Sequence, residues 1–398
     1  MSSMFWKSKK RIYLDYAASA PVSERSLSAF INNEKENSGN AGALYAEGVK
    51  AKKALENARK KIADIILCNP AEIIFTSGGT ESNNLALFGA LRAFREKFPG
   101  KTPHLVMSSV EHPSLMEPAH VLEKEGVRVT YVPVDSGGFV NPNDIYGALT
   151  DDTFLVSVIF VNNEIGTVEP VKEIGKAVER FRREKKSTYP IFHTDACQAG
   201  NYFDLRPGPL RADLMSVNSA KLYGPKGIGF LYKKKTVPLE PVVFGGGQEG
   251  GLRSGTEPVS LAVSFAEAFS ESAGIRERES KRLTLIRDWF FGELKRRVPS
   301  AGINGSLSGR SPNNINVSFS GMLAEEMILR LDAKGFSVSA RSACASRDEE
   351  GSYVIMAIGG NETEAKESIR ITTGRHTEKK DIEELLASIE QITEAFIK

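Results

Sequence analysis

Short apolar runs alternate with helical stretches through the middle of the chain, and this alternation restricts the fold more than any other feature. The runs expected to form strands are 72–76, 104–108, 127–132, 154–161 and 189–194, and those expected to form helices are 81–93, 114–124 and 171–185. The run 154–161 is almost entirely apolar and rich in β-branched residues, as is typical of a strand covered on both faces. Strand–helix–strand alternation favours a mainly parallel sheet with right-handed crossovers, and therefore an α/β fold.

The pattern changes after about Pro258. A long charged amphipathic helix is expected at 260–297, a strand at 314–319, and further helices at 324–334 and 379–396. This mixture indicates a smaller α+β unit at the C-terminal end of the chain. We therefore expect a large α/β domain over 15–260 and a smaller α+β domain built from 1–14 and 261–398.

Composition narrows the class of protein. The 398 residues carry 52 Lys and Arg against 50 Asp and Glu, a formal net charge of +2, so no overall attraction for nucleic acid or an anionic membrane is expected. No apolar run approaches the roughly 18 to 20 residues that span a bilayer, and the basic segment 1–11 does not lead into an apolar signal core. Three cysteines are too few for a disulfide scaffold and fit a reducing compartment. A cytoplasmic protein is expected.

A glycine turn follows the first expected strand. Residues 76–84 read Thr-Ser-Gly-Gly-Thr-Glu-Ser-Asn-Asn and open a helix. Glycines such as Gly79 let the backbone approach an anion, and free N–H groups at a helix start bind it, with Thr80 adding a hydroxyl. The spacing is neither that of a Walker loop nor that of a dinucleotide fingerprint. A phosphate site and a plain turn capped by Thr80 both remain open.

Two charged side chains are candidate site residues, and one of them, Asp195, follows an expected strand at the edge where ligands bind in such sheets. Asp195 closes the run 189–194 and needs a cationic partner, which is a protonated pyridine nitrogen, a lysine or a helix N-terminus. Lys221 precedes a tight turn, where it either forms a Schiff base with a carbonyl group or is simply solvated. The glycine-rich loop 245–256 indicates that a ligand or another subunit comes close to its backbone.

Several strings join these elements in a specific order. They are 13–18 (YLDYAA), 161–167 (VNNEIGT), 223–227 (YGPKG), 253–256 (RSGT), 342–344 (SAC) and 368–370 (SIR). Together they resemble a cysteine desulfurase of the NifS/IscS type, group I, within the class V aminotransferase group of fold-type I enzymes that use pyridoxal 5′-phosphate (PLP). The resemblance covers essentially the whole chain. It implies a mainly parallel seven-stranded sheet between helices plus a smaller α+β domain.

The resemblance implies a role for each residue around the cofactor ring. Lys221 is similar to the lysine that holds PLP covalently and later removes the substrate Cα proton. Asp195 matches the residue that keeps the pyridine nitrogen protonated. His112 matches the imidazole that stacks on the ring, and Gln198 the amide that hydrogen-bonds its phenolate oxygen.

The cofactor phosphate and the substrate have their own implied partners. Gly79, Thr80 and Asn218 would bind the phosphate, and Thr256 would reach it from the partner subunit, which requires a homodimer. Asn163 would lie beside the substrate and the cofactor oxygens. Arg370 matches the arginine that binds the substrate carboxylate, for which a planar two-pronged donor is suited.

Cys344 distinguishes this resemblance from an ordinary aminotransferase. In the family, a thiolate here attacks the sulfur of the bound L-cysteine, which leaves an enzyme persulfide and releases L-alanine. The polar stretch 341–351 resembles the long cysteine loop of group I enzymes, which implies transfer of sulfur to an iron–sulfur scaffold or a tRNA-thiolation protein. The same thiol is a candidate transient ligand of a nascent iron–sulfur cluster, and no other metal site is expected. Cys68 and Cys197 are expected to be packing residues.

The sequence departs from the family pattern at four positions. Ala220 stands where a histidine is usual before the lysine, which removes one phosphate contact, and Asn218 stands where serine is common. Arg341 replaces a glycine beside the cysteine, and Tyr45 replaces a histidine. Ala220, Tyr45 and Arg341 leave open a non-catalytic relative that binds a scaffold partner. A selenocysteine lyase, which shares the fold and cofactor, and another class V PLP aminotransferase also stay open.

Overall fold

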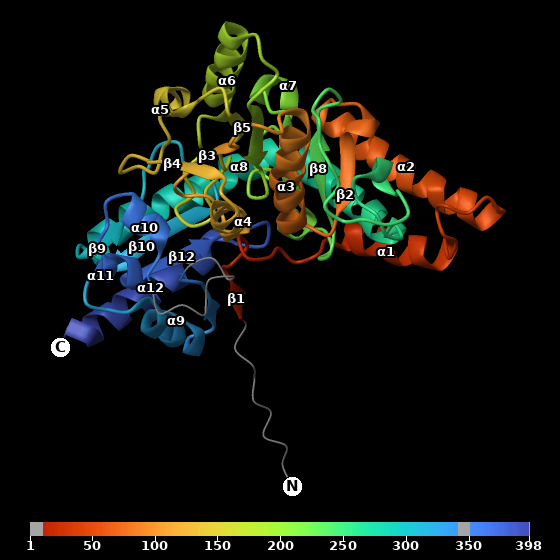
Figure 1. The fold of residues 1–398 in the computed structure, drawn as a ribbon. Helices are drawn as coiled ribbons and strands as arrows, with labels where there is room; N and C mark the ends of the chain where they lie inside the picture. Colours follow the sequence, from red (N-terminus) through yellow and green to blue (C-terminus); the bar gives the residue numbers. More distant parts are fainter. Residues whose placement is uncertain (1–10, 341–350, 398) are drawn as a thin grey trace.

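A seven-stranded sheet forms the centre of the larger part of the molecule (Figure 1). The computed structural model describes residues 11–340 and 351–397. The strand order is β2-β8-β7-β6-β5-β3-β4, with bounds β2 (Ile73–Thr76), β3 (His104–Ser108), β4 (Arg128–Val132), β5 (Thr153–Ser157), β6 (Ile191–Asp195), β7 (Leu214–Asn218) and β8 (Gly229–Lys233). Strand β8 runs antiparallel to both neighbours, and the remaining pairings are parallel. The predicted mainly parallel seven-stranded sheet is confirmed.

Helices cover both faces of this sheet because its strands are apolar on both sides. In β3, Val106 packs into one hydrophobic cluster, while Leu105 and Met107 pack into another on the opposite face. The first cluster includes residues of α2 (Ala46–Ile66), α6 (Val171–Lys185) and the first half of α8 (Val259–Arg297), and the second includes residues of α3 (Gly79–Lys97) and α4 (Pro113–Lys124). All five residues of β5 are buried, as the run 154–161 predicts.

A second, antiparallel sheet has the order β12-β10-β9 and a core of its own. Its strands are β9 (Ala301–Ile303), β10 (Asn314–Phe319) and β12 (Ser368–Thr372), flanked by α9 (Ala324–Ala333) and α12 (Lys379–Ile397). Strands β1 (Ile12–Tyr13) and β11 (Phe336–Ser337) form a separate two-stranded parallel sheet. Helix α8 is continuous, with Phe265 in the core of the large sheet and Phe290 in that of the small one. The domain boundary near residue 260 stays a prediction.

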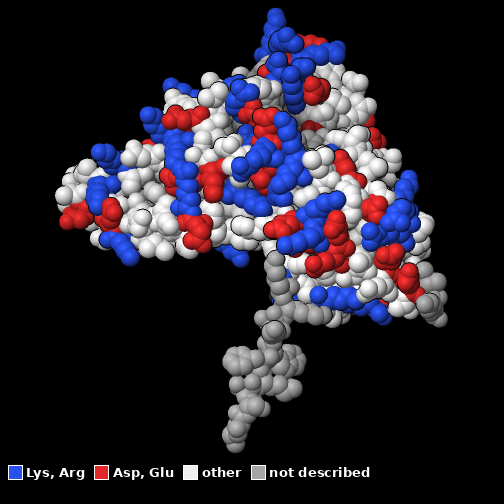
Figure 2. Space-filling model, turned by 180° about the vertical axis from the view of Figure 1, so that it is seen from behind, with Lys and Arg blue, Asp and Glu red and all other residues white. Residues whose placement is uncertain are grey.

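The remaining elements are short or peripheral. Helices α1 (Glu24–Glu36) and α2 extend from the end of the molecule opposite the small sheet (Figure 1). The other helices are α5 (Pro142–Ala148), α7 (Pro207–Leu210), α10 (Tyr353–Ala357) and α11 (Glu362–Glu367). The face in Figure 2 carries acidic and basic side chains side by side. Across residues 11–340 and 351–397, every helix is too short or too polar to cross a membrane.

The loop after β5 connects the two sheets. The Asn314 and Asn316 amides on β10 donate to the carbonyl oxygen of Glu164, at 2.9 and 3.1 Å. Gly166 has a φ of +74°, and a Cβ atom at that position would lie 2.5 Å from the Asn314 Cβ. Both the backbone conformation and the close approach therefore require glycine.

We expect Gly166→Ala to lower the free energy of unfolding by about 2 kcal/mol, because it combines a left-handed backbone with overpacking. Urea denaturation measures this change. The control is Gly147→Ala in the exposed face of α5, where an added Cβ meets nothing within 4 Å; its effect should be within about 1 kcal/mol. Equal stability of wild type and Gly166→Ala would contradict the account of this loop.

Candidate active site

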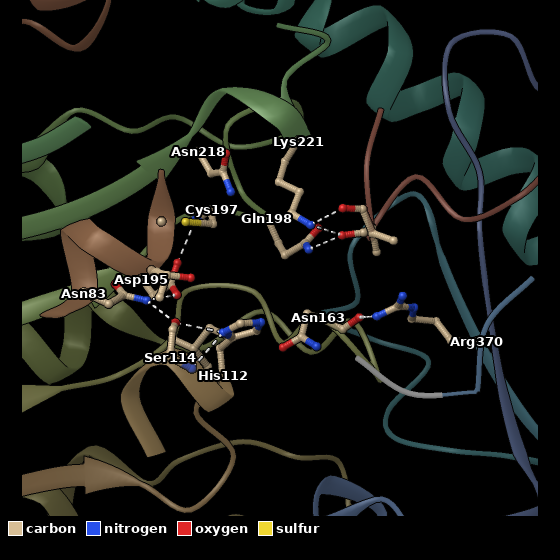
Figure 3. A pocket seen from close by; sticks show the side chains of 15 residues that line it. Asn83, His112, Ser114, Asn163, Asp195, Cys197, Gln198, Asn218, Lys221 and Arg370 are labelled. Carbon is tan, nitrogen blue, oxygen red and sulfur yellow. Dashed lines mark hydrogen bonds between the residues drawn. The ribbon is translucent and has the colours of Figure 1, made fainter. Parts of the chain in front are cut away.

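One pocket of about 140 Å³ lies at the carboxyl ends of the parallel strands (Figure 3). Strands β2, β3, β5, β6 and β7 all deliver residues to it, since parallel strands end at the same edge of a sheet. It is lined by Ala17, Ala18, Gly79, Thr80, Asn83, His112, Ser114, Ile159, Asn163, Asp195, Cys197, Gln198, Asn218, Lys221 and Arg370. The structure therefore brings together nine of the predicted site residues: Gly79, Thr80, His112, Asn163, Asp195, Gln198, Asn218, Lys221 and Arg370.

The N-terminus of α3 forms one wall of the pocket. Its N-cap residue is Gly78, and no side chain among the described residues caps the helix. A Cβ atom on Gly79 would lie 2.6 Å from the Cys197 Sγ, so only glycine fits there. The Asn218 Oδ1 accepts from the Ala220 N–H at 3.1 Å. The other polar atom of this side chain is the amide nitrogen, whose N–H groups can donate to a ligand. An uncapped helix N-terminus beside an amide donor suits a phosphate group.

Asp195 lies at the end of β6 with 4% of its surface exposed. Its Oδ1 accepts from the Cys197 N–H at 2.9 Å, and its Oδ2 accepts from the Asn83 Nδ2 at 2.7 Å. These neutral donors satisfy lone pairs of the carboxylate without supplying a positive charge. The site therefore suits a ligand that brings a protonated nitrogen to Asp195.

His112 forms the N-cap of α4, in the loop that follows β3. Its Nδ1 lies 2.8 Å from the Ser114 Oγ and accepts from the Ser114 N–H at 3.1 Å. Burial lowers the pKa of the imidazole, Asp195 opposes this shift, and the cations of Lys221 and Arg370 lower it further. The ring is therefore neutral at pH 7.

The segment that follows β1 contacts the lysine side of the pocket. The Lys221 Nζ donates to the carbonyl oxygens of Ala17, at 2.7 Å, and Ala18. The Gln198 Nε2 donates to the same Ala17 oxygen at 2.9 Å. These backbone oxygens fix the position of the amine at the edge of the pocket.

Arg370 enters the pocket from β12 of the small sheet, and 1% of its surface is exposed. Its Nη2 lies 2.8 Å from the Asp15 Oδ1, and its Nη1 donates to the Asn163 carbonyl oxygen at 3.0 Å. The Arg370 Nε has no hydrogen-bond partner among the described residues. A buried guanidinium with an unused N–H donor is suited to a carboxylate ligand.

Other predicted residues lie elsewhere. Thr256 is exposed and does not line the pocket of its own chain. Tyr45 is also exposed, at the N-cap of α2. Cys344 and Arg341 lie outside the described residues. Within residues 11–340 and 351–397, no group of three or more His, Cys, Asp or Glu side chains is placed to hold a metal ion.

Cys197, which was expected to be a packing residue, has a side chain that lines the pocket. Neighbouring side chains alternate between the faces of a sheet only within a strand, but β6 ends at Asp195 and the chain turns at Cys197. Burial raises the pKa of this thiol, and the neighbouring Asp195 carboxylate raises it further. Cys197 is therefore a neutral thiol in the pocket wall.

Sequence reasoning missed three side chains of the site and its surroundings: Asp15, Asn83 and Ser114. Each lies within or next to a quoted motif: Asp15 in 13–18, Asn83 in 76–84, and Ser114 two residues after His112. The bonds Arg370–Asp15, Asn83–Asp195 and Asn83–Ser114 join residues that are 355, 112 and 31 positions apart in the sequence. Only the folded chain shows these pairs.

Comparison with known proteins agrees with this geometry. The family described as "Aminotransferase class-V" matches residues 12–385. "Cysteine desulfurase IscS" of Dictyoglomus turgidum is 42% identical over 386 residues, covering 97% of this chain and 95% of that protein. A solved "NifS-like protein" superposes with a TM-score of 0.87 at 31% identity, covering 96% of this chain and 99% of that one. The structure "SspA in complex with cysteine" has a TM-score of 0.78 at 33% identity, covering 90% and 98%. The chain belongs to the class-V aminotransferase family and, within it, to the cysteine desulfurases.

Proposed function

We propose that this enzyme is a PLP-dependent cysteine desulfurase that converts L-cysteine to L-alanine and transfers the sulfur to Cys344. The observation that carries the proposal is the convergence of Lys221, Asp195, His112 and Arg370 on one pocket. The first three match the contacts expected for the cofactor, and Arg370 matches those expected for an amino acid carboxylate. The cysteine held by the related SspA structure supports L-cysteine as the substrate.

The residues of the pocket fit the cofactor. Lys221 would hold it covalently, Asp195 would face its ring nitrogen, and Gln198 its phenolate oxygen. The uncapped start of α3, with Gly79, Thr80 and the Asn218 amide, would bind the phosphate. When bound, PLP supplies an electron sink for the negative charge that develops at the substrate Cα.

The substrate would lie between the two sheets. Arg370 would bind its carboxylate, beside Asn163, and the Lys221 amine would take the Cα proton. The Cys344 thiolate would then attack the substrate sulfur. One C–S bond breaks and one S–S bond forms, so that cysteine and the Cys344 thiol become alanine and a Cys344 persulfide.

The proposal includes two kinds of protein partner. A second copy of the chain would bring Thr256 of the partner subunit to the phosphate, in accordance with the exposure of this residue in the single chain. The Cys344 persulfide would pass its sulfur to an iron–sulfur scaffold or a tRNA-thiolation protein. The cytoplasm is the compartment we propose, since a thiol-based carrier requires reducing conditions.

The direct test is incubation of the protein with PLP, L-cysteine and a reductant, followed by measurement of sulfide and alanine. Equal amounts of both are expected. Cys344→Ser and Lys221→Ala should each lower turnover by at least 100-fold, because each removes a reacting group, whereas the control Cys68→Ser should retain wild-type turnover. Alanine without sulfide, pyruvate in place of alanine, or full activity of Cys344→Ser would contradict the proposal. A far higher turnover of selenocysteine would instead support a selenocysteine lyase.

Asp15 provides a second test, since it is the charged partner of the proposed carboxylate-binding arginine. Asp15→Ala leaves the buried Arg370 guanidinium without a counter-charge, so the free energy of unfolding should fall by about 3 kcal/mol. We also expect the KM for cysteine to rise at least tenfold, because Arg370 is no longer held in place. Urea denaturation and steady-state kinetics measure the two effects.

The matched control for Asp15→Ala is Asp332→Ala. Asp332 also pairs with an arginine, Arg11, but both side chains are more than half exposed. Its loss should change stability by no more than about 1 kcal/mol and leave the KM unchanged. Similar behaviour of the two variants would show that the buried pair has no special role.

A further inference from the structure

A chain of hydrogen bonds connects Asp195 to His112 through two side chains that no role above includes (Figure 3). The Asn83 Nδ2 lies 2.7 Å from the Asp195 Oδ2 and 2.8 Å from the Ser114 Oγ. The Ser114 Oγ lies 2.8 Å from the His112 Nδ1. Asn83 is fully buried and Ser114 is 9% exposed. We call the path Asp195–Asn83–Ser114–His112 the relay.

The direction of each bond follows from the chemistry of the groups. The Asp195 carboxylate only accepts, so the Asn83 amide must present its nitrogen and not its oxygen to it. The two N–H bonds of that nitrogen go to Asp195 and Ser114, while the Asn83 Oδ1 has no partner among the described residues. Reversing the amide would place two oxygen acceptors face to face, which excludes that orientation.

The Ser114 hydroxyl therefore accepts from Asn83 and has its own proton left to donate. The acceptor within hydrogen-bond distance of this hydroxyl is the His112 Nδ1. The same nitrogen also accepts from the Ser114 backbone N–H at 3.1 Å. A ring nitrogen that accepts two hydrogen bonds carries no proton, so the single proton of the neutral imidazole is on Nε2.

The local fold places these groups together. His112 is the N-cap of α4, which brings its Nδ1 onto the N–H of Ser114, and Pro113 occupies the first helical position between them. Asn83 lies in the second turn of α3, beyond the phosphate-binding end of that helix. The relay thus connects the starts of two helices to the end of β6.

We propose that Asn83 and Ser114 are positioning residues, which hold His112 as the neutral tautomer protonated on Nε2 and fix its ring relative to Asp195. The inference rests on the proposed function, because it assigns the stacking position to His112. Its consequence for the reaction is that His112 presents an N–H donor and no acceptor at Nε2. The ring can therefore donate a hydrogen bond to a bound substrate, and removal of the Cα proton is left to Lys221.

The test is a measurement of the His112 tautomer in the holoenzyme. The protein is labelled with ¹⁵N-histidine and its imidazole nitrogens are recorded by long-range ¹⁵N–¹H correlation at pH 7. The chain has five histidines, and the signal lost in His112→Gln identifies His112, with the exposed His120 as an internal reference. We expect a protonated Nε2 and an unprotonated Nδ1. A protonated Nδ1, or an imidazolium, would overturn the proposal.

Substitutions of Ser114 and Asn83 distinguish a role in positioning His112 from a general effect on the structure. Ser114→Ala removes one donor from Nδ1, and Asn83→Ala removes the group that orients the Ser114 hydroxyl. In each, the population of the Nδ1-protonated tautomer should rise by about tenfold, as expected for loss of one buried hydrogen bond. Ser114→Thr retains a hydroxyl and should restore the wild-type spectrum. No change in either alanine variant, or a change that Ser114→Thr also shows, would overturn the proposal.

Ser109→Ala is the matched control. Ser109 is three residues before His112, and its buried hydroxyl has no hydrogen-bond partner among the described residues. The Ser109→Ala variant should leave the His112 spectrum unchanged, and a change equal to that of Ser114→Ala would contradict the relay. Sulfide release from the same samples keeps the two claims apart, since a wild-type protein with the expected tautomer and no sulfide would support the relay and contradict the proposed function.

Discussion

The burial of a carboxylate at the end of a central strand is the constraint around which the site is organised. Asp195 is 4% exposed, and its described hydrogen-bond donors are the Asn83 amide, the Cys197 backbone N–H and the Cys197 thiol. Neutral donors stabilise such a group only in part, so a cationic ligand at this position stabilises both itself and the fold. The start of α3, His112 and Lys221 line the same pocket as this carboxylate.

The second organising feature is the contact between the two sheets. Arg370 comes from β12 of the small sheet, yet it bonds to Asp15 and to the loop after β5. The segment that follows Asp15 supplies the backbone oxygens that hold Lys221 and Gln198. The proposed substrate therefore lies between an anchor from one sheet and a base from the other. A change in how the sheets pack would alter the distance between them.

The sequence supports the fold more completely than the site. All five residues of each of β3, β5 and β6 are buried, and the apolar residues of these runs predict the strands. The glycine turn correctly predicts the start of α3. Strands β7 and β8 were not predicted, and they lie on either side of the turn that contains Lys221. Their antiparallel pairing depends on that turn and not on periodicity.

Within the site, the predicted residues are those that a motif marks, and the missed ones act through contacts with distant parts of the chain. Asp15, Asn83 and Ser114 each look like ordinary polar residues of a turn or a helix start. Cys197 lines the same pocket, because the alternation of faces ends where strand β6 ends. Local pattern therefore identifies a reactive group more readily than the groups that orient it.

The central claim is that Lys221 is the residue that holds the cofactor in this pocket. Its most direct test is borohydride reduction of the PLP-loaded protein, followed by peptide mass spectrometry. The account predicts that the phosphopyridoxyl group is attached to Lys221 in near-stoichiometric amount. Attachment to another lysine, or no attachment in a protein saturated with PLP, would contradict it.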